Sequence, residues 1–219
     1  MVLLKIDKLS KSFGERKLFQ NLSWELEEGK VYSMMGANGT GKTTLFNIIT
    51  GFIKADAGDI TYLGNRLNGK SPYKIARLGL SRTFQDLRLI NGLTVRENVL
   101  LVLEKKMFHI ATYKEYEQVD NILEKVSLLD HAGHLGSDLS YGQQKLLTLG
   151  CCLANNPRLF LLDEPIAGID KDNLKKITEI ILNIKKEGKT VFQIEHNIEF
   201  LKATSDFIYG LDESGLKLL

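Results

Sequence analysis

The chain contains 219 residues, of which 43% are hydrophobic and 26% are charged, a composition that suits one globular domain with a sizeable core. Its 29 basic and 27 acidic residues are mixed along the sequence and leave a net charge of +2, which argues against a nucleic-acid-binding surface. Its apolar runs are far shorter than the roughly 20 residues of a membrane span, and residues 1–14 lack the apolar region of a signal peptide. The two cysteines, Cys151 and Cys152, are adjacent, which favours buried thiols in a reducing cytoplasm over a disulfide or a zinc site.

Strand patterns dominate the first part of the chain. Runs of apolar, β-branched and aromatic residues predict strands over residues 2–6, 22–28, 31–35, 58–67 and 80–85. The run over 31–35 predicts a buried strand, whereas 58–67 alternates like an exposed hairpin. Helices are predicted over 41–52, after a glycine-rich loop, and over 71–79, where Pro72 suits the first turn.

The pattern changes to helix between about residues 94 and 154. Apolar residues recur there at three- and four-residue spacing, in the segments 94–106, 113–129 and 141–156. Beyond this insertion, strands are predicted over 158–165, 190–196, 206–212 and 215–219, and helices over 171–188 and 197–205. This alternation predicts an α/β fold with a mainly parallel core sheet covered on both faces. We expect a single domain over residues 1–219, with a helical subdomain at about 94–154.

The stretch GANGTGKTT, residues 36–44, fits the pattern G-x-x-x-x-G-K-[ST] and lies between a predicted strand and a predicted helix. Glycines let backbone N–H groups converge on phosphate oxygens, and the helix start adds its positive dipole. Lys42 would reach the β- and γ-phosphates, and the Thr43 hydroxyl suits Mg²⁺. The predicted nucleotide contacts are Gly36, Ala37, Asn38, Gly39, Thr40, Gly41, Lys42, Thr43 and Thr44. The competing interpretation is a plain glycine-rich turn.

An acidic pair supplies the second element that nucleotide hydrolysis needs. The apolar segment LFLL ends in Asp163 and Glu164, directly before Pro165. Asp163 at a strand tip would hold Mg²⁺, directly or through water. Glu164 could accept a proton from the attacking water. Taken alone, the pair could equally be an acidic turn before proline; the glycine loop decides in favour of the catalytic interpretation.

Five further motifs follow in a fixed order. They are KSFG with Phe13, RTFQ with Gln85, LSYGQQK over Leu139–Lys145, AGID with Asp170, and IEHN with His196. In this order and spacing they resemble the motifs of the ATP-binding-cassette (ABC) family of P-loop nucleotidases, across essentially the whole chain. The resemblance implies the family's fold, in which an antiparallel N-terminal β subdomain and a helical subdomain join a core with a mainly parallel sheet.

The resemblance also implies roles for individual residues. In the family the aromatic ring at Phe13 stacks on adenine. Gln85 joins Mg²⁺ and the attacking water to the helical insertion, and His196 contacts the γ-phosphate. The D-loop carries Asp170. The signature residues Ser140, Gly142 and Gln143 meet ATP held by a second cassette. The implied catalytic residues are Glu164, His196, Gln85 and Lys42, and the implied metal ligands are Thr43, Gln85 and Asp163.

The implied protein is the ATP-binding and ATP-hydrolysing subunit of a membrane importer, using ATP and Mg²⁺. It would lie at the cytoplasmic face of the membrane, attached only through transmembrane permease subunits, and would pair with a second ABC ATPase, identical or sister. The segments TTLFNIITGF and LSYGQQ, with Tyr141, resemble the branched-chain amino-acid uptake subgroup. Several features differ from common family patterns: the arginines usual at the positions of Leu146 and Cys151 are absent, the loop before residue 113 is short, and many relatives continue beyond the final segment 215–219.

Alternatives remain at the level of residues and of function. Phe13 could be a core aromatic, His196 a helix-cap or strand-end residue, and Gln85 an ordinary surface glutamine. No role is assigned to His109, His131 or His134. The chain could also be a soluble ABC ATPase acting on ribosomes or DNA, although it has neither a second cassette nor a basic extension. A non-hydrolysing regulator is disfavoured because Glu164, Gln85 and His196 are all present.

Overall fold

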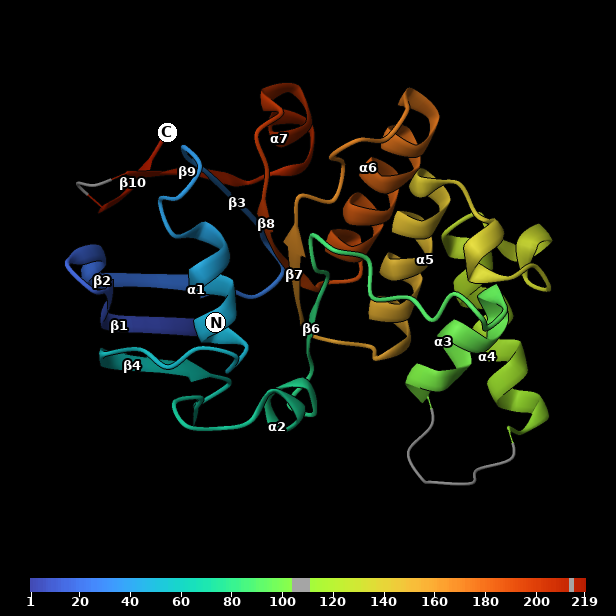
Figure 1. Cartoon of the computed structure of the whole chain (residues 1–219), viewed down its shortest axis with the longest axis horizontal. Helices are drawn as coiled ribbons and strands as arrows, with labels where there is room; N and C mark the ends of the chain where they lie inside the picture. Colours follow the sequence, from blue (N-terminus) through green and yellow to red (C-terminus); the bar gives the residue numbers. More distant parts are fainter. Residues whose placement is uncertain (104–110, 213–214) are drawn as a thin grey trace.

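The computed structural model describes residues 1–103, 111–212 and 215–219. Two sheets and seven α-helices make up this part of the chain (Figure 1). The helices are α1 Lys42–Ile49, α2 Pro72–Ala76, α3 Val95–Leu103, α4 Tyr113–Lys125, α5 Tyr141–Ala154, α6 Lys171–Lys186 and α7 Ile198–Thr204. The end of the helix predicted over 94–106, and His109, lie outside the described residues.

The core sheet has six strands in the order β10-β9-β3-β8-β7-β6. They are β3 Val31–Met35, β6 Leu80–Arg82, β7 Leu159–Asp163, β8 Thr190–Ile194, β9 Phe207–Asp212 and β10 Gly215–Leu218. All neighbours pair in parallel except β9 and β10, which are antiparallel. Every residue of β7 and β8 is buried, as expected for parallel strands covered on both faces. The predicted mainly parallel α/β sheet is confirmed.

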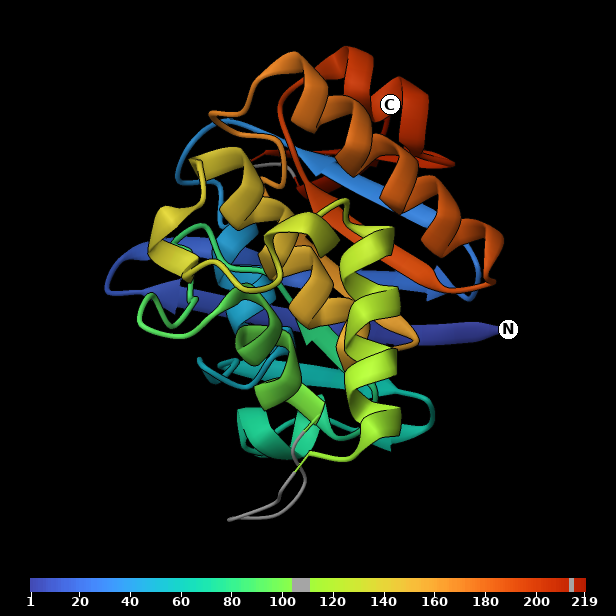
Figure 2. The same cartoon turned by 90° about the vertical axis from the view of Figure 1, so that its right-hand side faces the viewer.

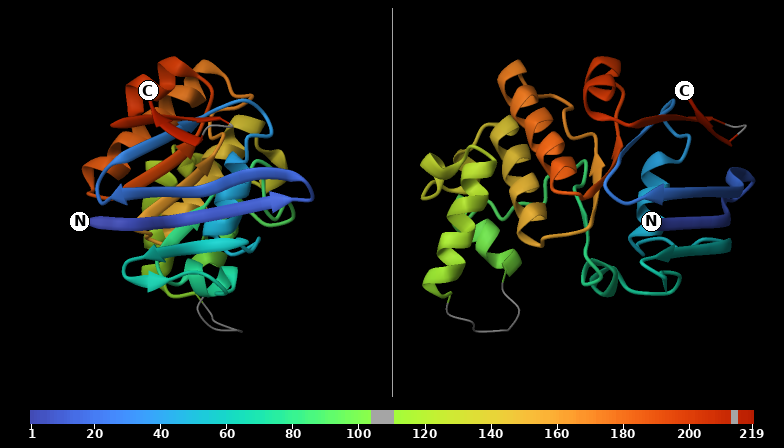
Figure 3. Two further views of the ribbon diagram at one scale, coloured as in Figure 1. Left: turned by 90° about the vertical axis from the view of Figure 1, so that its left-hand side faces the viewer. Right: turned by 180° about the vertical axis from the view of Figure 1, so that it is seen from behind.

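A second, antiparallel sheet is formed by the N-terminal region in the order β2-β1-β4-β5. Its strands are β1 Val2–Phe13, β2 Arg16–Glu27, β4 Ala57–Tyr62 and β5 Asn65–Arg66. Figure 3 shows this sheet on the side of the molecule opposite to α3, α4 and α5. Helix α1 and the aromatic rings of Trp24, Phe46 and Phe192 belong to the core between the two sheets, with ring centroids 4.7–4.9 Å apart.

The predictions for the first two strands were too short. β1 and β2 each span twelve residues, and their register shifts at several points. Lys8 and Asn21 have positive φ angles of 50° and 55° at these irregularities. Each irregularity breaks the strict alternation of buried and exposed positions on which the sequence prediction relied. The hairpin over 58–67 is present, with Ile60 and Tyr62 buried on one face and Asp59, Asn65 and Arg66 exposed.

Helix α6 packs on β8 and α5 lies beside it, while α3 and α4 pack on α5 on the side away from the sheet (Figure 1 and Figure 2). Helices α3, α4 and α5 lie in the segment predicted as a helical insertion, and α5 returns the chain to β7. Cys152 is buried on α5 and Cys151 is partly buried, and both thiols are free, as predicted. The strand predicted over 80–85 ends at Arg82, because only Leu80, Ser81 and Arg82 pair with β7.

Candidate functional site

The glycine-rich loop runs over residues 36–41, from the carboxyl end of β3 to the first residue of α1. A Cβ atom at Gly36 would lie 2.4 Å from the carbonyl oxygen of Leu211. At Gly41, φ is 103°, and a Cβ would lie 2.8 Å from the ring of Phe19. Both positions therefore require glycine. Ala37, Asn38 and Gly39 are exposed, so the backbone at the loop tip is open to a ligand.

Lys42 is the first residue of α1, and its side chain crosses back over the loop. Its ammonium donates to the carbonyl oxygens of Gly36 at 2.7 Å and Ala37 at 2.9 Å. Burial lowers the pKa of Lys42, while the nearby carboxylates of Glu164 and Asp163 act in the opposite direction. A buried ammonium at the start of a helix, beneath an open loop, is suited to binding phosphate.

Asp163 ends β7, two strands away from the loop in the sheet order β3-β8-β7. Its backbone N–H donates to the hydroxyl of Thr83 at 3.0 Å, and its Oδ2 accepts from Arg82 at the same distance. Burial raises the pKa of Asp163, and the hydrogen bond and charge of Arg82 oppose that rise. The carboxylate therefore stands at the same edge of the sheet as the glycine loop.

Glu164 follows in the left-handed conformation, with φ 48°. Its two carboxylate oxygens face two of the predicted catalytic residues. Gln85 Nε2 lies 3.4 Å from Oε2, and His196 Nε2 lies 4.0 Å from Oε1. Lys145 donates from α5 to the backbone carbonyl of Glu164. The structure thus brings Glu164, Gln85 and His196 together, although Gln85 lies beyond the end of β6 rather than within a strand.

Glu195 was overlooked by the sequence analysis. It is buried between β8 and His196, and its carboxylate accepts from the backbone N–H groups of Ile166 at 3.0 Å and His196 at 2.9 Å. These two bonds fix the loop after Glu164 and the backbone of His196. The available signal was an acidic residue directly after an apolar strand, but the motif IEHN was interpreted through His196 alone.

Phe13 ends β1 at the tip of the first hairpin, and its ring is 50% exposed. The interpretation of Phe13 as a core aromatic is therefore wrong. Arg16, on the other side of the same turn, donates to the carbonyl oxygen of Gly39 at 2.8 Å. This bond joins the hairpin tip to the tip of the glycine loop. An exposed aromatic ring thus stands on the element that borders the phosphate-binding loop.

The signature segment begins α5. Ser140 is the N-cap and forms a capping box with Gln143, in which each side chain bonds to the backbone N–H of the other residue. Gln143 Nε2 also lies 2.9 Å from His131 Nε2, a contact that the sequence did not reveal. A Cβ at Gly142 would lie 2.4 Å from Nδ2 of Asn173, so glycine is needed for this packing.

Asp170 is the N-cap of α6 and accepts from the backbone N–H of Asn173 at 2.9 Å and from its side chain at 2.6 Å. These bonds hold the pKa of Asp170 below its usual range. Asp170 and Gly142 therefore meet at the same asparagine. The starts of α5 and α1 lie in different halves of the molecule in Figures 1 and 3. Among the described contacts, those of Ser140 stay within α5 rather than reaching the glycine loop.

The predicted metal ligands carry oxygen donors. Thr43, Gln85 and Asp163 offer a hydroxyl, an amide and a carboxylate oxygen. Mg²⁺ is typically held by one or two carboxylates with water and substrate phosphates, so this set fits that ion. Over residues 1–103, 111–212 and 215–219, no group of three or more His, Cys, Asp or Glu side chains could hold a metal ion unaided. The donors therefore suit an ion that arrives with a phosphate ligand.

The fold and this edge of the sheet define a P-loop nucleotide-binding protein. Comparison with known proteins narrows the class: residues 19–167 match the ABC transporter family. The high-affinity branched-chain amino acid transport ATP-binding protein LivG of Salmonella typhimurium (strain LT2) is 35% identical over 225 residues, covering 96% of this chain and 88% of LivG. A probable LivG of Methanocaldococcus jannaschii is 33% identical, covering 95% and 86%.

Solved structures agree. An ATP-binding cassette of an ABC transporter in its ADP conformation superposes with a TM-score of 0.88 at 31% identity, covering 99% of this chain and 90% of that one. A dimeric cassette in a post-hydrolysis state, bound to ADP and Pi, gives 0.86 at 27% identity, covering 99% of both chains. The chain belongs to the ABC transporter family and is a nucleotide-binding ATPase subunit of that family. No helix among its described residues is long and apolar enough to cross a membrane.

Proposed function

We propose that this chain is the ATPase subunit of an importer that takes up amino acids of the branched-chain type. The observation that carries the proposal is the arrangement of Gln85 and His196 on either side of the Glu164 carboxylate, beside the Lys42 cradle. The names of its LivG relatives support the solute class. A non-hydrolysing regulator would not need this arrangement.

The chemistry follows from the placement of these groups. Phe13 stacks on adenine, and the glycine loop and Lys42 hold the β- and γ-phosphates. Thr43, Gln85 and Asp163 would hold Mg²⁺, which would supply positive charge to neutralise the phosphates. Glu164 accepts a proton from the attacking water, and the oxygen of that water bonds to the γ-phosphorus. The bond between the γ-phosphorus and the bridging oxygen of the β-phosphate breaks, giving ADP and Pi. Gln85 and His196 orient the water and the γ-phosphate.

Two chains are needed for one complete site. The N-terminal end of α5, with Ser140, Gly142 and Gln143, is separated from its own glycine loop, so it is free to meet ATP held by another cassette. The positive end of the helix dipole at this start suits a γ-phosphate. We propose a head-to-tail pair, with itself or with a sister ATPase, that forms when ATP binds and separates after hydrolysis.

Glu164→Gln tests the catalytic assignment. The amide keeps the shape of the side chain but cannot accept the proton, so hydrolysis should fall by roughly two to four orders of magnitude, while ATP binding is retained. With Mg-ATP the variant should elute as a dimer on size exclusion, and adding Ser140→Arg should restore the monomer. Wild-type hydrolysis by Glu164→Gln would refute the base assignment. An inactive variant that stays monomeric would point to a sister ATPase as the partner.

The permease is proposed to dock on a groove between the core and the helical layer. This cavity of about 470 Å³ is lined mainly by apolar side chains, including Phe52, Phe84, Leu89 and Leu101. Leu89, in the segment that follows Gln85, lies on its wall. Attachment through this groove would keep the subunit at the inner face of the membrane.

Cysteine crosslinking tests the docking site. Because Cys151 and Cys152 also line the groove, the experiment starts from a chain in which both are serine. A cysteine at Leu89 should crosslink to the co-expressed permease. A cysteine at Lys185, which forms an ion pair with Asp206 away from the groove, serves as the control. Crosslinks from position 185 without any from position 89 would refute this placement.

A further inference from the structure

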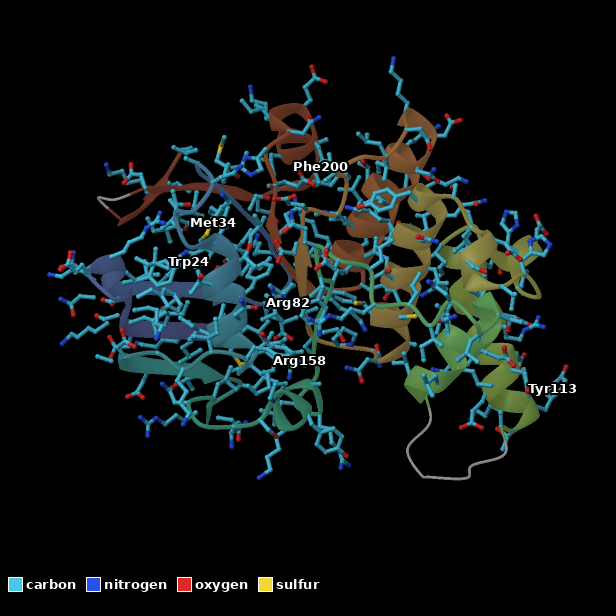
Figure 4. The ribbon with its side chains drawn as sticks, viewed as in Figure 1. Trp24, Met34, Arg82, Tyr113, Arg158 and Phe200 are labelled. Carbon is cyan, nitrogen blue, oxygen red and sulfur yellow. The ribbon has the colours of Figure 1, made fainter. Side chains whose placement is uncertain are left out.

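Arg82, the last residue of β6, lies between α1 and β7 near the middle of the molecule (Figure 4). One end of its guanidinium, Nη2, donates to Oδ2 of Asp163 at 3.0 Å. The other, Nη1, donates to Oδ1 of Asn47 at 2.7 Å and to the hydroxyl of Thr50 at 3.2 Å. The Arg82 side chain is 4% exposed and that of Asp163 is 2% exposed. The pair is therefore shielded from solvent, where an exposed ion pair would be weak.

Two aromatic rings border the same guanidinium. Its central carbon lies 5.4 Å from the centroid of Phe46 and 4.7 Å from that of Phe84. Phe46 belongs to α1, and Phe84 directly precedes Gln85. A guanidinium that has directional bonds at its edge and aromatic rings beside it has little freedom to move. Its fixed position therefore restricts the positions of the side chains that it binds.

The elements in contact with Arg82 carry the three proposed Mg²⁺ ligands. Helix α1 carries Thr43 in its first turn, β7 ends at Asp163, and the segment after β6 leads to Gln85. Asp163 is separated from Arg82 by 81 positions in the chain, and Asn47 by 35. The sheet already pairs Arg82 with Leu161 of β7. The guanidinium adds a side-chain link from these two strands to α1.

We propose that Arg82 is a positioning residue that fixes the placement of Asp163 relative to the glycine-loop helix, so that Mg²⁺ meets preset ligands. Mg²⁺ requires near-octahedral geometry at about 2.0–2.1 Å, so a small displacement of the carboxylate weakens the site. Arg82 holds the carboxylate of Asp163 through Oδ2. This inference rests on the proposed assignment of Asp163 and Thr43 to Mg²⁺. It adds a residue that does not touch the ion.

The test measures affinity for a non-hydrolysable ATP analogue by calorimetry, in excess Mg²⁺ and in EDTA. The ratio of the two dissociation constants is the gain due to the metal. In Arg82→Met this ratio should fall about tenfold, with affinity in EDTA unchanged within twofold. Arg82→Lys keeps the charge but cannot form both sets of bonds, so it should also lose the gain. Asn47→Ala removes the anchor on α1 without touching Asp163 and should show a smaller loss.

Arg158→Met is the control, because Arg158 is an arginine whose ion pair with Glu28 lies away from the site. Its ratio should match the wild type. Melting curves show whether each variant is folded, and Arg82→Lys and Asn47→Ala keep the test decisive if Arg82→Met does not fold. A wild-type ratio in Arg82→Lys and Asn47→Ala would overturn the positioning role. A wild-type chain without any gain from Mg²⁺ would instead refute the proposed metal site.

Discussion

Replacing Phe13 with alanine tests whether the first hairpin binds the base of the nucleotide. A core phenylalanine changed to alanine typically costs about 3–5 kcal/mol of folding free energy. For a chain of this size, that would lower Tm by roughly 6–20 °C, at about 2–4 °C per kcal/mol. The Phe13 ring is half exposed, so little of this cost applies. Stacking on a base is worth about 1–3 kcal/mol, which corresponds to a roughly 5- to 150-fold change in affinity.

We therefore expect Phe13→Ala to bind ATP about 5- to 150-fold more weakly, with little change in the Tm of the nucleotide-free protein. Calorimetry gives the affinity, and thermal unfolding without nucleotide gives Tm. Phe13→Tyr keeps the ring and should bind nearly as the wild type does. Tyr113→Ala removes an exposed ring at the start of α4, which points away from the molecule in Figure 4, and should change neither quantity.

Two outcomes would refute the reasoning about Phe13. A large fall in the Tm of Phe13→Ala without a change in ATP affinity would mean that the ring stabilises the fold. An equal loss of affinity in Phe13→Ala and Tyr113→Ala would mean that the assay does not report stacking. A loss confined to Phe13→Ala and restored in Phe13→Tyr supports the placement of adenine at the hairpin tip.

Three further predictions follow from the site and from α5. Lys42→Ala should weaken ATP binding roughly 10- to 150-fold, the worth of a charge-assisted hydrogen bond, and unchanged affinity in calorimetry would contradict the phosphate cradle. Lys145→Met removes the donor to the Glu164 carbonyl and should lower kcat about tenfold, or ~1.4 kcal/mol, with ATP affinity unchanged; equal losses in both would indicate general damage. Burial raises the pKa of Cys151 to about 12. At pH 8, iodoacetamide should therefore modify Cys151 about a thousandfold more slowly than a free cysteine of pKa about 8.5. Mass spectrometry measures the modification, and rapid labelling of the native protein would contradict the burial of Cys151.

The parts of the site that the sequence predicted are those whose residues are consecutive in the chain. The glycine loop needs a strand before it and a helix after it, and all three occur within residues 31–49. Asp163 and Glu164 follow directly from the apolar run that ends at the same edge of the sheet. Parallel strands bring their carboxyl ends together, so the convergence of these two motifs was foreseeable once both strands were recognised.

The residues that the sequence did not reveal act through contacts between distant segments. Arg82 meets Asp163 across 81 positions, and Lys145 meets Glu164 across 19. Glu195 supports the loop after Glu164 across 29 positions. In the sequence Arg82 and Lys145 are charged residues among many, because nothing local distinguishes a buried charge with a partner from an exposed one. Glu195 had only its place directly after an apolar strand as a signal. Only the packing of β6, β7, β8 and α5 against one another identifies them.

The first turns of α5 connect two proposed functions, contact with the nucleotide of a partner cassette and support of Glu164. Ser140 caps the helix, and Lys145, little more than one turn later, holds the carbonyl of Glu164. Gly142 packs on Asn173, whose own bonds go to Asp170 at the start of α6. A γ-phosphate bound by a partner cassette would therefore contact the start of α5, and the next turn of the same helix holds Glu164, the proposed base, through Lys145. Glu164 has a φ angle of 48°, and this conformation costs a non-glycine residue free energy. Contacts with the surrounding structure must therefore hold Glu164 in place. Lys145 does so from the same helix that is proposed to meet the partner, so the proposed dimer contact and the placement of the base would depend on one packed unit.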